Sequence, residues 1–201
     1  MKRLFDLFFS SATLLLLSPL LVIIICCIVL FQGTPVFFLH KRLGKNHKKF
    51  HIYKFCTMKN TKDENGKLLS DKDRTTKLGS FLRKTSIDEL PGFVNVLIGD
   101  MSVVGPRPLP PQYLERYSKE QDKRHEVKPG ITGWAQINGR NAISWEEKFK
   151  YDLWYVKNNS FYVDMKIILL TINYVLSRKD IVPYNKDAME EFLGTNKNID
   201  Q

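Results

Sequence analysis

One long apolar run near the amino terminus dominates the pattern of hydrophobic and polar positions. The stretch from Leu7 to Leu39 contains no Asp, Glu, Lys, Arg or His, and a helix of about 20 apolar residues is enough to cross a bilayer. Ser18-Pro19 interrupts this run. Proline removes a backbone donor and bends a helix, and a serine hydroxyl can bond a carbonyl that the bend frees. The pattern predicts a membrane-associated helix that is broken at Ser18 and Pro19.

Basic residues flank the run on both sides. Lys2 and Arg3 precede it, and a series of lysines and arginines begins at Lys41. Positive charges favour the cytoplasmic side of a membrane, so both ends are expected there, which a single crossing does not allow. The charges therefore favour a re-entrant helical hairpin, although a kinked spanning helix remains the alternative on these residues alone.

The rest of the chain predicts one small domain of short elements. Phe50 to Phe55 alternates like a strand, and Thr76 to Lys84 has helical spacing. The charged stretch from Asn60 to Arg74 between them predicts a loop. Phe93 to Ile98 predicts a largely buried helix, which Gly99 ends.

Two further helices are predicted towards the carboxyl terminus. Ser144 with Glu147 is the pattern of a capping box, and Asp164 to Ser177 has an apolar stripe that fits either the core or a membrane interface. The fold class is therefore mostly α with short β segments, with interfacial amphipathic helices. We divide the chain into a re-entrant membrane helix (1–39), a cytoplasmic globular domain (40–179) and a polar tail (180–201), in which Ala188 to Leu193 is a helical candidate.

The charge balance indicates anionic partners. The formal net charge is +10, from 31 basic and 21 acidic residues, and His40 to Lys54 is basic with no acid. Nucleic acid, phosphorylated small molecules and anionic lipids all fit such a stretch, but its place just after the apolar run favours lipid or lipid phosphate. The pair His47 and His51 has the spacing of helical metal ligands, yet no Cys or carboxylate lies nearby, so we predict no metal site from this pair.

Asp88-Glu89 is the candidate chemical centre. Ser86 and Glu89 match a capping box, whereas Pro91 favours a later start with Asp88 as the N-cap, which puts the proline in the first turn. Both alternatives put Asp88 at a helix amino terminus, where the helix dipole favours an ionised carboxylate. An ionised carboxylate can act as a nucleophile, and adjacent carboxylates can hold Mg²⁺, but the pair is equally typical of a simple cap.

Arg107 is the candidate phosphate ligand. Gly105-Pro106-Arg107-Pro108 fixes the backbone in a rigid, non-helical turn, and an arginine fork matches phosphate oxygens. A structural ion pair is the alternative for this arginine. Asn138 to Asn141 predicts a tight polar loop ahead of the helix that starts at Ser144.

Taken together, these motifs resemble those of the bacterial sugar transferase family, the small monotopic phosphoglycosyl transferases. The resemblance covers the chain up to about Arg178 and is strongest to members that begin bacterial N-linked glycan assembly. It rests on the following motifs: Ser18-Pro19, Tyr53-Lys54-Phe55, Ser86 to Leu97, Gly99 to Ser102, Gly105 to Pro108, and Pro129 to Trp145.

The resemblance implies an enzyme that moves a sugar-1-phosphate from a UDP-sugar to undecaprenyl phosphate and releases UMP. It implies ping-pong catalysis through a phosphosugar-aspartyl intermediate on Asp88, with Mg²⁺ held by Asp88 and Glu89. N,N′-diacetylbacillosamine is the expected sugar, with UDP-galactose or a UDP-N-acetylhexosamine as alternative donors.

The resemblance also assigns the remaining site residues. Lys54, Arg83, Arg107 and Arg140 are assigned to substrate binding, because cations neutralise phosphate charge. Asp152 is assigned to the same site, where it would orient one of these cations.

The resemblance further implies a monotopic protein of the bacterial inner membrane with its catalytic domain in the cytoplasm. Its partners would be the UDP-sugar, undecaprenyl phosphate, membrane lipids and downstream glycosyltransferases, but not nucleic acid. Two other classes fit the charge and the anchor without the carboxylates, a membrane-tethered binding module and a structural scaffold. Neither of these would need Asp88.

Overall fold

The computed structural model describes residues 1–139, 143–177 and 191–194. Helices predominate and the strands are short, which confirms this part of the predicted fold class. The helices are α1 (Lys2–Leu16), α2 (Ser18–Phe31), α3 (Asp71–Arg74), α4 (Lys77–Lys84), α5 (Gly92–Ile98), α6 (Lys119–Asp122), α7 (Trp134–Ile137), α8 (Trp145–Asn158) and α9 (Phe161–Ser177). The described residues also contain four short 3₁₀ segments, namely η1 (Lys45–His47), η2 (Ile87–Glu89), η3 (Pro111–Arg116) and η4 (Lys123–Glu126).

Four strands form two separate pairs among the described residues. β1 (Phe37–Leu43) and β2 (Lys49–Phe55) make an antiparallel hairpin, in which Phe37 lies opposite Phe55. β3 (Ser102–Val104) and β4 (Gly130–Thr132) run parallel. The alternation of Phe50 to Phe55 thus predicted a strand that the structure contains.

The apolar run folds as two helices that meet at the predicted break. α1 and α2 are bent by 60° relative to each other, and Ser18 Oγ donates to the carbonyl of Leu15 at 2.8 Å. Among the described residues, no single helix has the length and apolar character to span a membrane, whereas this bent pair meets both criteria together. The break therefore forms as predicted at Ser18 and Pro19.

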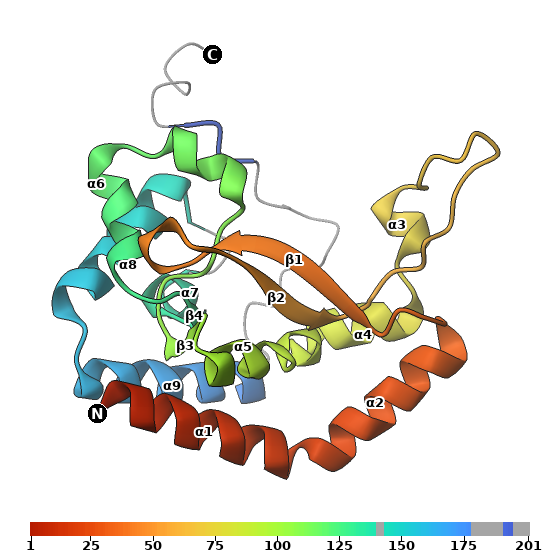
Figure 1. Cartoon of the computed structure of the whole chain (residues 1–201), viewed down its shortest axis with the longest axis horizontal. Coiled ribbons are helices and arrows are strands. Elements are labelled where there is room, and N and C mark those ends of the chain that lie inside the picture. The colour runs from red at the N-terminus through yellow and green to blue at the C-terminus, as the bar shows by residue number, and fades with distance from the viewer. Residues whose placement is uncertain (140–142, 178–190, 195–201) are drawn as a thin grey trace.

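The first helix is held against the domain by polar contacts. Figure 1 shows α1 running along the base of the molecule beside α9 and α5. Lys2 pairs with Asp164 of α9 and also donates to the hydroxyl of Tyr155 at 3.0 Å. Arg3 donates to the carbonyls of Val96 and Leu97 at the carboxyl end of α5, where a cation is favoured. Lys2 and Arg3, whose charges were predicted to favour the cytoplasmic side of a membrane, thus also hold α1 against the domain.

Asp6 provides a buried link between α1 and β3. Its carboxylate accepts from Ser102 Oγ at 2.9 and 3.0 Å and from the backbone N–H of Val103 at 3.0 Å. We expect Asp6→Ala to lower the free energy of unfolding by about 2–3 kcal/mol, because two buried donors lose their acceptor. Urea unfolding in detergent would measure this loss. Ser11→Ala, on the exposed side of α1, serves as the control, and an equal effect of both changes would contradict the link.

The core lies between the hairpin, α5 and the carboxyl-terminal helices. Its largest cluster comprises Phe50, Ile52, Phe93, Val96, Met101, Val103, Val104, Ile137, Tyr155, Ile167 and Ile168. The predicted apolar stripe on α9 has a buried and an exposed part. Ile168 is buried in this core, whereas Leu169 and Ile172 are exposed.

Part of the tail packs on the domain. Phe192 is buried against Tyr113 and Phe149, and Glu191 pairs with Arg116 at 2.7 Å. Residues 191–194 are not helical, so the predicted helix from Ala188 to Leu193 does not extend over them. Residues 188–190 lie outside the described part of the chain.

Candidate functional site

Asp88 and Glu89 lie in η2, between α4 and α5. Ser86 precedes them in a left-handed conformation (φ 56°) and makes no side-chain cap. The predicted capping box is therefore wrong, because an N-cap residue needs an extended backbone that Ser86 does not have. Pro91 occupies the N-cap position of α5 and makes no side-chain cap, so α5 begins at Gly92 and Asp88 is not its N-cap either. A non-glycine residue held in this conformation two positions before Asp88 is a strained feature of the kind found at functional sites.

Glu89 is the centre of an ion-pair network. Its Oε1 accepts from Lys54 Nζ at 2.7 Å and from Arg107 Nη2 at 2.9 Å. Burial raises the pKa of Glu89, but the charges of Arg107 and Lys54 outweigh this and hold the pKa well below its usual range. Glu89 therefore stays ionised, and in return it raises the pKa of Arg107.

Asp88 has a different environment from its neighbour. Its side chain is largely buried, with 9% of the residue exposed. Burial, together with the nearby charge of Glu89, raises the pKa of Asp88 to about 6, even though Lys54, Arg83 and Arg107 lower it. Burial and a like charge thus outweigh the helix dipole, which was expected to favour the ionised form, although a carboxylate with this pKa is still mostly ionised at pH 7. A carboxylate with a pKa near neutrality is a common feature of reactive sites.

Each cation is positioned by a separate element. Lys54 continues the inward-facing row of β2 that includes Phe50 and Ile52, since alternate residues of a strand share a face. Asn95, which is fully buried in α5, fixes that strand: it accepts from the N–H of Tyr53 and donates to the carbonyl of His51. These bonds hold β2 and α5 together, and with them Lys54 and Glu89.

Arg107 extends from the rigid turn that follows β3. Gly105 N donates to the Thr132 carbonyl, and Gly130 N donates to the Pro106 carbonyl, each within 3.0 Å. An added Cβ at Gly105 would lie 2.3 Å from the Lys128 carbonyl oxygen, so the backbones approach too closely for any larger residue. The side chain of Arg107 remains 50% exposed, which leaves its fork accessible to a ligand.

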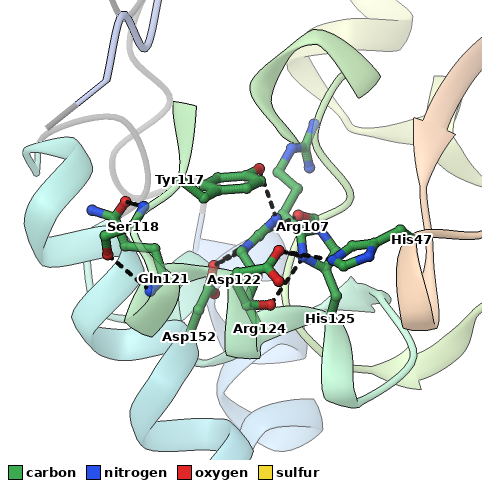
Figure 2. A network of polar contacts seen from close by, with 9 residues as sticks. All are labelled: His47, Arg107, Tyr117, Ser118, Gln121, Asp122, Arg124, His125 and Asp152. Atoms are coloured by element: carbon green, nitrogen blue, oxygen red, sulfur yellow. Dashed lines mark hydrogen bonds and ion pairs between the residues drawn. The ribbon is translucent and has the colours of Figure 1, made fainter. Parts of the chain in front are cut away.

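The other predicted residues have different positions. Arg83 donates to Thr57 Oγ1 at 2.8 Å, and its charge lowers the pKa of Asp88. Arg140 lies outside the described residues. Asp152 is buried and pairs with Arg124, whose Nη2 also donates to the backbone carbonyl of Arg107 at 2.7 Å. Figure 2 shows this chain of contacts, through which Asp152 reaches Arg107 by way of Arg124. A direct role of Asp152 in substrate binding stays a prediction.

Sequence reasoning missed three cations near the site. Arg42 and Arg107 line the same small cleft of about 40 Å³ together with Lys54 and Glu89. Burial and the charge of Arg107 lower the pKa of Arg42 to about 10, and the same causes lower the pKa of Lys148 to about 8. Arg124 is the third. Arg42 belonged to the basic run that was assigned as a whole to lipid or lipid phosphate, and nothing local marked Lys148 or Arg124.

A larger hollow of about 420 Å³ lies elsewhere, between the end of α2 and the start of α4. Its lining includes Phe31, Lys59, Arg74, Lys77 and Leu78. Neither Asp88 nor Glu89 lines it, whereas Glu89 lines the smaller cleft together with Lys54 and Arg107.

Comparison with known sequences identifies the family. The sequence model of the bacterial sugar transferase family matches residues 1–178, which include every element that positions the carboxylate pair. The chain belongs to the bacterial sugar transferase family. Within it, the uncharacterized sugar transferase EpsL of Bacillus subtilis is 52% identical, and the match covers 97% of this chain and 96% of EpsL.

Two further members of the family are longer proteins. The undecaprenyl-phosphate galactose phosphotransferase of Salmonella typhimurium is 40% identical over 73% of this chain. The UDP-glucose:undecaprenyl-phosphate glucose-1-phosphate transferase of Escherichia coli is 43% identical over 69% of this chain. The matched segments span only about a third of these relatives, 34% and 32% of their lengths.

Proposed function

We propose that this chain is a phosphoglycosyl transferase that moves a sugar-1-phosphate from a UDP-sugar to undecaprenyl phosphate and releases UMP. The observation that carries the proposal is a carboxylate pair, with Asp88 buried and Glu89 partly buried, beside cations that can neutralise a diphosphate, namely Lys54, Arg83 and Arg107. The two relatives whose names specify this class of reaction support it.

Asp88 is the proposed nucleophile. One of its oxygens would form a bond to the sugar-bearing phosphorus while the bond from that phosphorus to the bridging oxygen breaks, so that UMP leaves with the electron pair. An oxygen of the lipid phosphate would then attack the same phosphorus and release Asp88. The raised pKa of Asp88 fits this role, because a more basic carboxylate is a better nucleophile that is still ionised at pH 7.

Glu89 and its cations would position the diphosphate. Glu89 is ionised and holds Lys54 and Arg107 side by side. Because Arg107 is half exposed, its outer donors can bind a phosphate while Glu89 retains the inner contact. Lys54 and Arg107 both donate to the same oxygen of Glu89, Oε1.

The carboxylate pair fits Mg²⁺, the cofactor that we propose. The charge of Glu89 disfavours the ionised form of Asp88, and a cation bound to both would relieve this repulsion. Mg²⁺ sites in proteins combine one or two carboxylates with substrate phosphates. Bound by Asp88 and Glu89, the ion would neutralise charge on the diphosphate. This proposal rests on the chemistry of the donor set.

The first donor that we propose is UDP-N,N′-diacetylbacillosamine, with UDP-galactose and UDP-N-acetylhexosamines as alternatives. The names of the Salmonella and Escherichia relatives specify galactose and glucose for those enzymes. The panel of candidate donors therefore includes UDP-glucose as well.

We further propose that the protein is monotopic in the bacterial inner membrane, with its domain on the cytoplasmic side. Its base exposes large apolar side chains on α1, α2 and α9, and such patches mark membrane contacts. Phe5 of α1 contacts Phe161 of α9, which places these helices side by side (Figure 1). The exposed residues include Leu4, Phe8, Leu15, Leu16, Val22, Ile23, Leu30, Leu169, Ile172 and Val175. The acceptor lipid and downstream glycosyltransferases would share this membrane.

An exchange experiment tests the reaction and its covalent step together. Labelled UMP, Mg²⁺ and each UDP-sugar are incubated with the purified chain in the absence of undecaprenyl phosphate. We expect label to enter the correct UDP-sugar, because a phosphosugar-aspartyl intermediate can transfer its group back to UMP. Net UMP release should require the lipid acceptor. Exchange that appears only with the acceptor present would contradict the covalent step, and no turnover of any donor with the acceptor present would contradict the function.

A further inference from the structure

Three potential metal ligands meet at the tip of the β1–β2 hairpin, away from the carboxylate pair. His47 comes from η1 in this hairpin, while Asp122 and His125 come from the end of α6 and from η4. His47 Nε2 lies 2.8 Å from Asp122 Oδ1, and His125 Nδ1 lies 3.2 Å from the same oxygen. Figure 2 shows the two imidazole rings directed at Asp122 from opposite elements.

This grouping differs from the pair that the sequence suggested. His51 lies in β2 opposite Lys41, whereas His47 lies in the turn between the strands, so the two histidines do not share a helix. His47 and its neighbour Asn46 both have positive φ angles, 61° and 51°. The turn brings His47 against η4, where its ring centroid lies 4.9 Å from that of His125.

The spacing of the three side chains suits a tetrahedral ion. Zn²⁺ binds histidine nitrogen and carboxylate oxygen at about 2.0–2.2 Å, which places neighbouring ligand atoms roughly 3.3 Å apart. The separations of 2.8 and 3.2 Å require only a small expansion, and the ligand atoms of all three residues lie within 4.8 Å of one another. Two imidazoles and one carboxylate are also a ligand set that Zn²⁺ and similar ions prefer.

The exposure of the group also fits. His125 is 5% exposed, so its ring is held within the domain. Its Nε2 has no hydrogen-bond partner among the described residues, and its Nδ1 is the ring nitrogen that faces the Asp122 carboxylate. His47 and Asp122 are partly exposed, so an ion and a water ligand can reach them.

The neighbouring Arg124 does not prevent cation binding. Its guanidinium is buried against Asp152, with Nε and Nη2 donating to Oδ2 at 3.0 and 2.7 Å. That carboxylate balances the charge of Arg124, so the carboxylate of Asp122 is available to balance a bound ion.

We propose that His47, Asp122 and His125 form a binding site for a divalent transition metal ion of the Zn²⁺ class, with water as the fourth ligand. The ion would join the hairpin tip to η4. Arg124 of η4 donates to the backbone carbonyl of Arg107, so an ion that holds η4 in place would also restrict the backbone of Arg107. The proposal is independent of the transferase function.

Metal binding to the full chain in detergent tests the proposal. Co²⁺ absorption and equilibrium dialysis with Zn²⁺ would be measured in excess Mg²⁺, so that the proposed Mg²⁺ site at Asp88 and Glu89 does not take up the probe ion. We expect one tightly bound ion in the wild type and at least a tenfold weaker affinity in His47→Ala and in Asp122→Asn. Because both side chains are partly exposed, these variants should fold, and thermal unfolding without metal would check this.

His51→Ala is the matched control, because His51 is an exposed histidine of the same hairpin that does not face the group. It should bind Co²⁺ and Zn²⁺ as the wild type does, and Zn²⁺ should raise the melting temperature of both. Wild-type binding no tighter than that of His47→Ala would overturn the proposal. Equal losses in His51→Ala and His47→Ala would overturn it as well, since binding would then be non-specific.

Discussion

Asp88→Asn should reduce the rate of UMP release by at least about a thousandfold, because an amide cannot replace a carboxylate nucleophile. Asparagine has nearly the same shape, so the loss would come from the chemistry and not from the packing. The measurement is UMP release in the presence of Mg²⁺, undecaprenyl phosphate and the donor found by exchange. Label exchange into that donor should disappear as well.

The same substitution should leave the protein at least as stable as the wild type. The pKa of Asp88 is raised from 3.8 to about 6 in the folded state, so the folded protein binds more protons than the unfolded chain between these pH values. The stability that Asp88 contributes therefore falls as the pH rises from 4 to 6 and stays low above pH 6. With Mg²⁺ removed by EDTA, the variant should gain roughly 1–3 kcal/mol at pH 7.5 and little at pH 4.

Asp63→Asn is the matched control for Asp88→Asn. Asp63 lies in an exposed loop, where its Oδ1 accepts from the N–H groups of Asn65 and Lys67, and asparagine can accept the same bonds. This variant should keep wild-type activity and show no such dependence of stability on pH. Wild-type activity in Asp88→Asn would remove Asp88 from the reaction, and a large loss of its stability at pH 7.5 would contradict the environment described here.

Asp152→Ala should produce the largest loss of stability among the substitutions considered. Asp152 and Arg124 form a pair in which both side chains are nearly inaccessible, with 6% and 3% exposed. Removing the carboxylate leaves a buried cation without its partner, which costs about 3–5 kcal/mol. For a chain of this size, the melting temperature should fall by roughly 10 °C. Circular dichroism in detergent would measure it.

A double substitution separates the ion pair from simple packing. Arg124→Met combined with Asp152→Leu removes both charges and should recover much of the stability that Asp152→Ala loses, because apolar pairs of similar volume replace buried ion pairs well. Glu120→Ala, which removes an exposed pair with Lys123, should change little and serves as the control. A loss in Asp152→Ala no greater than in this control would contradict the buried pair.

The pair also predicts a defect in activity through Arg107. Arg124 holds the backbone carbonyl of Arg107 at 2.7 Å, so the double variant should bind the UDP-sugar more weakly even where its stability recovers. The readout is the KM for the donor, because Arg107 is proposed to bind the diphosphate. An unchanged KM would show that the turn of Gly105 to Pro108 holds Arg107 without help from η4.

Local features were determined by the sequence itself. The uncharged run with Ser18-Pro19 predicted two helices that meet at a bend, and the serine hydroxyl makes the expected bond. The alternation in β2, the Ser144 capping box and the helix end at Gly99 are all present. Each depends on residues only a few positions apart, whose backbone preferences and hydrogen bonds act within one element.

The properties of the site were decided by tertiary structure. Whether Asp88 has a low or a raised pKa depends on its burial and on cations from β2, α4 and the turn after β3, which lie far apart in the chain. The partner of Asp152 and the meeting of His47 with His125 depend equally on which elements pack together. Sequence reasoning could name a carboxylate pair and its candidate cations. Burial and Coulomb interactions act through space, so only the packed structure determined their strength and their partners.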